Sequence, residues 1–408
     1  MAPTLTGLAI VLAVAVAAPL VLSLVPWLPI PSVVVEIALG IVIGPHVLGL
    51  IGTMDDVTTV LALLGVTFLL FFAGVELDLR GIVNRRFVRI IAAYAASLAL
   101  AAAIGVGLHA VGVDAPPAFL AIALSATGLG VLLPIMKDEG LLDTEYGQVV
   151  FGACAVAEVV PLILLAIAYP TMANGVGEQL ARVALLVGVA GLVGIAVLIA
   201  QRRPAVIRRL DRLSDTSAQL RVRLTLLILI GLAALATQLG IEVIVGAFAA
   251  GLVIGADRDA LEANAAHVRK LEGVGFGLLV PVFFVATGIR LDVGAVLGDP
   301  GALGLVVVLL LALLAIRGLP VLLYGPLMTA RERAGAAFLQ ATSLSFLIAS
   351  AVVGLELHVV GTASATALVM AGMGSVLLFP LAARRILRRT DLTLVDALDT
   401  PAGTQQPL

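Results

Sequence analysis

Apolar windows of about 20 residues recur along the whole chain, and this pattern constrains the fold more than any other feature. A helix of that length spans the hydrocarbon core of a bilayer. Only 12% of the 408 residues are charged, whereas soluble domains contain about 25%, and the mean hydropathy is +1.18. We therefore predict an all-α integral membrane protein with about 13 transmembrane helices. The predicted spans are residues 4–25, 31–50, 58–77, 89–113, 116–136, 147–171, 179–200, 220–238, 241–256, 270–290, 301–325, 334–354 and 361–383.

The positions of the basic residues test this count, because cytoplasmic loops carry an excess of Lys and Arg. When the loops are assigned alternately to two sides, nearly all of the 24 Lys and Arg residues fall on the side of the C-terminus. The exceptions are Arg182, Arg290 and Arg317, of which Arg317 lies within a span. This sorting predicts a multi-pass protein of the plasma membrane with its N-terminus outside and its C-terminus in the cytoplasm. The net charge of −2 predicts no nucleic-acid partner.

Two charged residues of opposite sign lie inside apolar spans. Glu158 is near the middle of the sixth span, and Arg317 is in the eleventh. An ionisable group at that depth costs on the order of 3 kcal/mol and by default marks a transport or proton-relay site. The alternative is a buried salt bridge that locks the two spans together, although such a pair is weak evidence for stability.

Small polar residues interrupt the fifth and twelfth spans. Helices broken near the middle of a membrane free backbone groups and helix ends for ion binding, and they occur at corresponding places in the two halves of an inverted repeat. The alternative is that these residues allow helices to pack closely. We predict an inverted repeat with two broken helices, in which the residues at the breaks are Gly128, Thr342, Ser343 and Ser345, with Ser125 and Thr127 just before Gly128.

Five stretches together resemble the second group of monovalent cation:proton antiporters, the sodium/proton exchanger-like family that includes potassium-efflux antiporters. They occur in the family's order and extend the resemblance over about residues 20–385. They are LPIPSVVVEIALGIVIGPHVLGL (28–50), FLLFFAGVELDLR (68–80), ALSATG (123–128), VGAFAAGLV (245–253) and PVFFVATGIRLD (281–292).

The resemblance implies a homodimer in which a core moves against a scaffold, with spans 5 and 12 crossing inside the core. The scaffold and dimer domain would consist of residues 1–88 (spans 1–3) and 220–292 (spans 8–10). The core transport domain would consist of 89–171 (spans 4–6) and 293–389 (spans 11–13). Residues 172–219 would form a linker span with a basic loop, and 390–408 a short cytoplasmic tail.

The family's ion site is a pair of polar or acidic residues on the sixth span, which reads Ala157-Glu158 here. The resemblance therefore implies Glu158 as the carrier, Ser125 and Thr127 beside it, and Arg317 as its charge partner. Burial raises the pKa of a carboxylate and a nearby cation lowers it, so protons and metal cations can compete for one site. An arginine does not release its proton in proteins. One titrating acid then predicts electroneutral exchange of Na⁺ or K⁺ for H⁺.

The remaining charged residues carry weaker predictions. Glu36, within the second span, is a candidate for the lining of an ion funnel, or it bonds locally. The four His residues are dispersed and Cys154 is the single cysteine, so we expect no transition-metal site and no cofactor. No nucleotide-binding or hydrolytic motif is present, so we expect no enzyme. Two alternatives stay open: a proton-coupled transporter of another solute on this scaffold, and a membrane sensor that transports nothing.

Overall fold

The computed structural model describes residues 5–24, 32–52, 54–76, 85–128, 144–169, 176–201, 219–256, 265–291, 293–325 and 327–387, with the single residues 132, 136, 141 and 203. Every regular element in this part is a helix. The first elements are α1 (Thr6–Leu24), α2 (Ser32–Ile43), α3 (Asp56–Glu76), α4 (Arg85–Ala110), α5 (Pro117–Ser125), α7 (Glu145–Ala168), α8 (Val176–Gln201) and α10 (Leu220–Gln238). They are followed by α11 (Val243–Gly255), α13 (Ala265–Val274), the π-helical turn η1 (Gly275–Leu279), α14 (Val280–Arg290), α15 (Val293–Leu297), α16 (Pro300–Gly318), the 3₁₀ segment η2 (Leu319–Tyr324), α17 (Ala330–Ala341), α18 (Ser345–Glu356) and α19 (Thr362–Leu387).

The all-helical membrane architecture is confirmed. Ten helices in the described residues are long and apolar enough to cross a bilayer, and Ser32–Ile43 and Val243–Gly255 are shorter apolar helices. Each predicted span contains helix, but α5 has only nine described helical residues. The number of crossings therefore stays a prediction. The basic loop between α8 and α10 lies mostly outside the described residues, as do Asp292 and the tail at 390–408.

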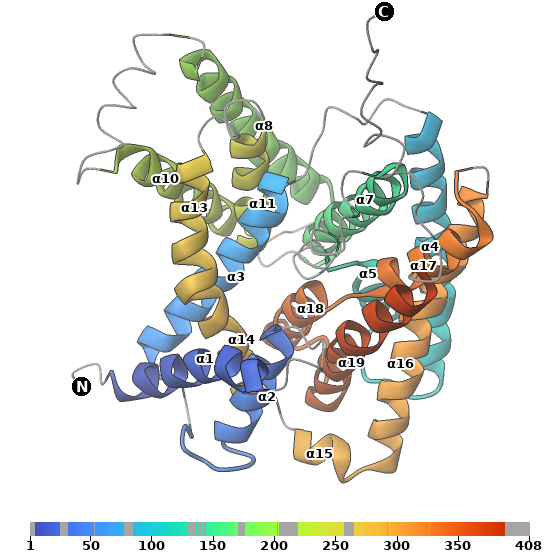
Figure 1. The fold of residues 1–408 in the computed structure, drawn as a ribbon. Helices are drawn as coiled ribbons and strands as arrows, with labels where there is room; N and C mark the ends of the chain where they lie inside the picture. Colours follow the sequence, from blue (N-terminus) through green and yellow to red (C-terminus); the bar gives the residue numbers. More distant parts are fainter. Residues whose placement is uncertain are drawn as a thin grey trace, which may run out of the picture.

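The helices form two groups, which are visible on opposite sides of Figure 1. In the first, α2 packs on α14 and α3 packs on both α11 and α14, while α10 covers α11. In the second, α4 packs on α5 and α7, and α16, α17 and α18 pack around α19. Helix α8 contacts both α7 and α11 and so touches both groups. That the groups act as a scaffold and a moving core stays a prediction.

Glycines bring the backbones of the first group into close contact. A methyl group on Gly251 of α11 would lie 2.1 Å from the carbonyl oxygen of Phe71 in α3, and one on Gly288 of α14 would lie 2.2 Å from that of Ile37 in α2. Small residues allow this approach in membrane helices. The first group is thus held together by backbone surfaces in direct contact.

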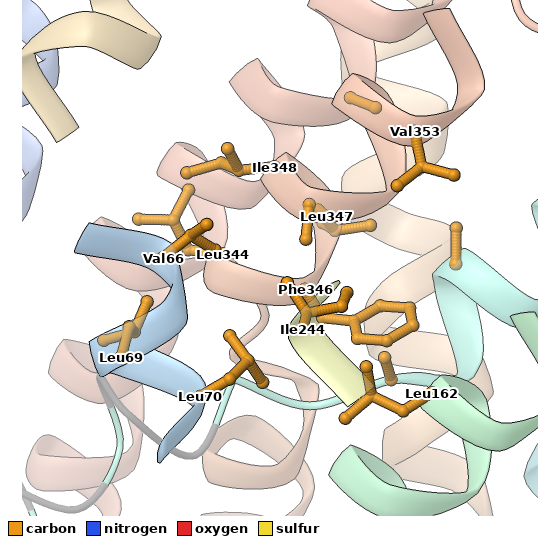
Figure 2. Close-up of a cluster of buried hydrophobic side chains, with 14 of the residues drawn as sticks. Val66, Leu69, Leu70, Leu162, Ile244, Leu344, Phe346, Leu347, Ile348 and Val353 are labelled. Carbon is orange, nitrogen blue, oxygen red and sulfur yellow. The ribbon is translucent and has the colours of Figure 1, made fainter. Parts of the chain in front are cut away.

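Apolar side chains fill the space between the groups. Leucine, isoleucine and valine side chains of α3 and α11 meet those of α7, α18 and the chain just before α18 (Figure 2). Such contacts carry no directional hydrogen bonds. The residues labelled in Figure 2 are Val66, Leu69, Leu70, Leu162, Ile244, Leu344, Phe346, Leu347, Ile348 and Val353.

The helix of the fifth span ends early, the helix of the twelfth span is interrupted, and these two places meet. Helix α5 ends at Ser125 and the next residue has extended backbone, while α17 ends at Ala341 and α18 begins only at Ser345. The N–H of Gly128 donates a hydrogen bond to the carbonyl of Thr342, with a nitrogen–oxygen distance of 3.0 Å. The inverted repeat that would relate the two breaks stays a prediction.

Candidate functional site

Pro161 in α7 leaves one backbone carbonyl of the helix available to bond another segment of the site. A helical N–H normally bonds the carbonyl four residues earlier, and Pro161 has no N–H. The carbonyl of Ala157 is therefore left without its helical donor. It accepts instead from the N–H of Thr127, at 3.2 Å. This bond attaches α7, next to Glu158, to the break that follows α5.

The Thr127 side chain joins two more segments. Its hydroxyl donates to the carbonyl of Gln340 in α17, at 2.6 Å. The same oxygen accepts from Nε of Arg317 in α16, at 2.9 Å. Thr127 is fully buried, so the side chain is a structural junction of the two broken helices and the buried arginine.

Arg317 is 2% exposed and contacts three other parts of the chain. Besides Thr127, its Nη1 donates to the hydroxyl of Ser97 in α4 at 3.2 Å, and Nη2 donates to the carbonyl of Ala153 in α7 at 3.4 Å. Its Cζ lies 5.6 Å from the ring centroid of Tyr94, within cation–π distance. Each of these four contacts is with a neutral group.

Glu158 is 1% exposed on α7. Cys154, one helical turn earlier, lies within electrostatic range of both Glu158 and Arg317. The two charged residues predicted from the sequence therefore occupy the same buried region. That Arg317 pairs directly with Glu158 stays a prediction.

Ser125 lies at the end of α5, where its hydroxyl donates to the carbonyl of Ile122 at 3.0 Å. The hydroxyl of Tyr94 lies 3.2 Å from the same Ser125 oxygen. The sequence analysis did not single out Tyr94 or Ser97. The available signal was two polar side chains three residues apart, hence on one face, in an otherwise apolar span.

The twelfth-span residues surround the other break. The N–H of Ser343 donates to the hydroxyl of Ser375 in α19, at 3.0 Å, and the hydroxyl of Thr342 bonds within its own helix end, to the carbonyl of Phe338. The hydroxyls of Ser343 and Ser345 are buried with no hydrogen-bond partner in the described part of the chain. Buried hydroxyls normally have partners, which makes these two candidate ligands.

Glu36 is also buried, but it belongs to the first group of helices. Its helix, α2, packs mainly against α14 and reaches α19 of the second group. A role for Glu36 in an ion funnel between the two groups stays a prediction.

Two broken helices that meet beside buried charges, within a bundle of membrane-length helices, are typical of secondary transporters. Residues 11–389 match the family described as sodium/hydrogen exchanger, transmembrane. The chain belongs to this family, and the resemblance inferred from the sequence is confirmed.

Several relatives carry antiporter names. The putative Na⁺/H⁺ antiporter YjbQ of Bacillus subtilis (strain 168) is 27% identical over 402 residues, which cover 95% of this chain and 64% of the relative. The Na⁺/H⁺-K⁺ antiporter GerN of Bacillus cereus is 30% identical over 264 residues, covering 64% of this chain and 65% of the relative. Cation/H⁺ antiporter 20 of Arabidopsis thaliana is 32% identical over 308 residues, covering 68% of this chain and 36% of the relative. The chain thus spans less than two thirds of the length of each.

A solved structure has the same fold. The sodium proton antiporter MjNhaP1 from Methanocaldococcus jannaschii, at pH 8, superposes with a TM-score of 0.62 over 93% of this chain and 97% of that chain. The sequence identity is 16%, so this similarity supports the fold alone.

Proposed function

We propose that the protein is a secondary active antiporter that exchanges a monovalent cation, Na⁺ or K⁺, for H⁺ by alternating access. The observation that carries the proposal is the fully buried Glu158, placed next to the junction of the two broken helices. Membership of the exchanger family supports it, as do relatives named for Na⁺ and K⁺ exchange. A carboxylate in this position holds either a proton or a dehydrated cation, and competition between the two couples their movements.

The neutral ligands of the cation would be oxygen atoms around the junction. Ser125 and Thr127 remain proposed ligands, although each hydroxyl already makes two hydrogen bonds. The hydroxyls of Ser343 and Ser345, which have no hydrogen-bond partner in the described residues, add two oxygen atoms to the proposed site. Oxygen ligands suit hard cations, as they do for Ca²⁺ and Mg²⁺. Na⁺ and K⁺ both fit this donor set.

The exchange would be electroneutral. Ala157 stands where the family has a second polar residue, and Arg317 does not release its proton. Glu158 is then the single titrating group proposed for the ion site. It would carry one H⁺ in one direction and one monovalent cation in the other, so no net charge would move in a cycle.

The remaining proposals concern location and assembly. We expect a homodimer in the plasma membrane with the N-terminus outside and the C-terminus in the cytoplasm, on the basis of the charge sorting and the family. We expect the first helix group to serve as scaffold and the second as moving core. The chain belongs to a transporter family, and we expect no enzymatic activity.

Substitution of the carrier tests the proposal. Purified protein in liposomes should move protons when Na⁺ or K⁺ is added, and Glu158→Gln should abolish this while preserving the helical spectrum, because the amide is nearly isosteric. Glu158→Asp should retain exchange with a changed apparent cation affinity, since its carboxylate is one methylene shorter. Glu272→Gln, at an exposed position on α13, is the matched control and should resemble the wild type. Normal cation-driven proton movement in Glu158→Gln would refute the proposed role of Glu158.

A further inference from the structure

Helix α19 lies close against the backbone of the break between α17 and α18. Gly372 and Ser375 of α19 are three residues apart, hence on one face, and both are buried. A methyl group on Gly372 would lie 2.9 Å from the carbonyl oxygen of Ser343 and 3.2 Å from Cδ1 of Leu344. The lack of a side chain at Gly372 therefore lets the Ser375 hydroxyl reach the break.

The break leaves the N–H of Ser343 without its helical acceptor. In a continuous helix this N–H would bond the carbonyl of Leu339, but that carbonyl accepts from the N–H of Thr342, at 3.2 Å. The hydroxyl of Ser375 is the acceptor instead, at 3.0 Å. Because a buried N–H without a partner is costly, this bond stabilises the break in its present shape.

The Ser375 hydroxyl is itself anchored on α19. Its oxygen lies 2.7 Å from the carbonyl oxygen of Gly372, one turn earlier in the same helix, and 3.1 Å from that of Ser343. A hydroxyl has one proton to donate and two lone pairs to accept with. Donation to either carbonyl leaves the oxygen able to accept from the Ser343 N–H. Ser375 thus fixes the backbone of Ser343 relative to α19.

The fifth span holds the same segment at a second point. The N–H of Gly128 donates to the carbonyl of Thr342 at 3.0 Å, and a methyl group on Gly128 would lie 3.1 Å from the backbone nitrogen of Leu344. From this segment extend the side chains of Ser343 and Ser345, whose buried hydroxyls have no hydrogen-bond partner in the part of the chain that the structure describes.

We infer that Ser375 is a positioning residue for the ion site: by holding the backbone of Ser343, it fixes where the hydroxyls of Ser343 and Ser345 meet a cation. This inference rests on the proposed function, in which those two hydroxyls are ligands. Ligands held in place by neighbouring hydrogen bonds bind more tightly than ligands that must first be ordered. The affinity for the cation would therefore depend on a side chain that the cation does not contact.

The test measures cation-driven proton movement by the full chain in proteoliposomes, at one fixed pH, with Na⁺ and K⁺ in turn. Ser375→Ala removes the acceptor for the Ser343 N–H. The KM for the cation should rise about three- to tenfold, the scale of one hydrogen bond between membrane helices, while the maximal rate is retained. Ser375→Thr should restore the KM, because a helical threonine can bond the carbonyl three residues earlier.

Two further variants separate positioning from folding. Ser364→Ala is the matched control, because it removes another buried hydroxyl of α19, about 16 Å from Ser375 along the helix, and it should keep the wild-type KM. If Ser375→Ala does not fold, Ser375→Cys keeps the shape of the side chain with a weaker acceptor, and its KM should also rise.

A double-mutant cycle tests whether Ser375 acts through the two hydroxyls. Ser343→Ala combined with Ser345→Ala removes the proposed ligands and should raise the KM. In that background Ser375→Ala should change the KM no further, because no ligand is left to position. An unchanged KM after loss of both hydroxyls, or a Ser375→Ala effect of the same size in both backgrounds, would overturn the inference.

The outcomes also distinguish this inference from the proposed function. If the wild type moves no protons in response to Na⁺ or K⁺, or if Glu158→Gln still does, the proposed function fails. If the wild type exchanges and Glu158→Gln is inactive, while Ser375→Ala keeps the wild-type KM, the inference alone is overturned. A lower maximal rate with an unchanged KM would assign Ser375 a purely structural role and would also overturn it.

Discussion

Thr127→Val is the most informative single substitution in the junction. Valine has nearly the shape of threonine but lacks the hydroxyl. The change therefore leaves the backbone bond from Thr127 to Ala157 in place. It removes the donor to the carbonyl of Gln340 and the acceptor for Nε of Arg317.

The stability lost in Thr127→Val depends on whether other groups can satisfy the two polar atoms that lose their partner. Leaving a buried donor or acceptor unsatisfied costs about 1–3 kcal/mol in soluble proteins, which would give about 2–6 kcal/mol for the two groups. Hydrogen bonds between membrane helices have averaged only about 0.6 kcal/mol, with a maximum near 1.7, because the unfolded chain in the membrane also finds partners. We therefore expect Thr127→Val to lower the free energy of unfolding by about 1–3 kcal/mol.

The assay is unfolding in mixed micelles with an increasing fraction of denaturing detergent, followed by circular dichroism. Thr127→Ser keeps the hydroxyl and should recover most of the loss. Thr287→Val is the matched control: among the described residues, the Thr287 hydroxyl bonds only the carbonyl of Phe283, one turn earlier in its own helix, so its removal should cost little. Equal stability of Thr127→Val and Thr287→Val, with unchanged exchange in both, would refute the junction role of Thr127.

Three further substitutions test other parts of the structure. Arg317→Ala removes the donors to Thr127, Ser97 and the Ala153 carbonyl, so the protein should unfold at a lower temperature than the wild type; an unchanged melting temperature would contradict the role of Arg317 in the junction. Gly251→Val puts a side chain where a methyl would already lie 2.1 Å from the Phe71 carbonyl oxygen, so thermal unfolding should occur well below the wild-type temperature; a wild-type melting curve would contradict the close packing of α3 on α11. If exchange is electroneutral, its rate should not respond to a valinomycin-clamped voltage, whereas Ala157→Asp adds an acid and should make transport voltage-sensitive; a voltage-dependent wild type would point to a second carrier.

The sequence by itself determined the membrane class and the positions of the unusual residues. Apolar windows of membrane length leave helices as the available fold, and Ser, Thr and Gly within two windows indicated the breaks now seen after α5 and α17. The burial of Glu158 and Arg317 followed from their place inside apolar spans. Each of these predictions depends on properties of one segment at a time.

The tertiary structure alone decided which side chains meet. Membrane helices are apolar on nearly every face, so their periodicity does not identify which face packs against which neighbour. The contacts of Arg317 with Tyr94 and Ser97 depend on the packing of α16 against α4. Pro161 reveals in the sequence that the carbonyl of Ala157 is free, but its partner Thr127 comes from another helix. These contacts join residues far apart in the chain, and only the packing of the helices brings them together.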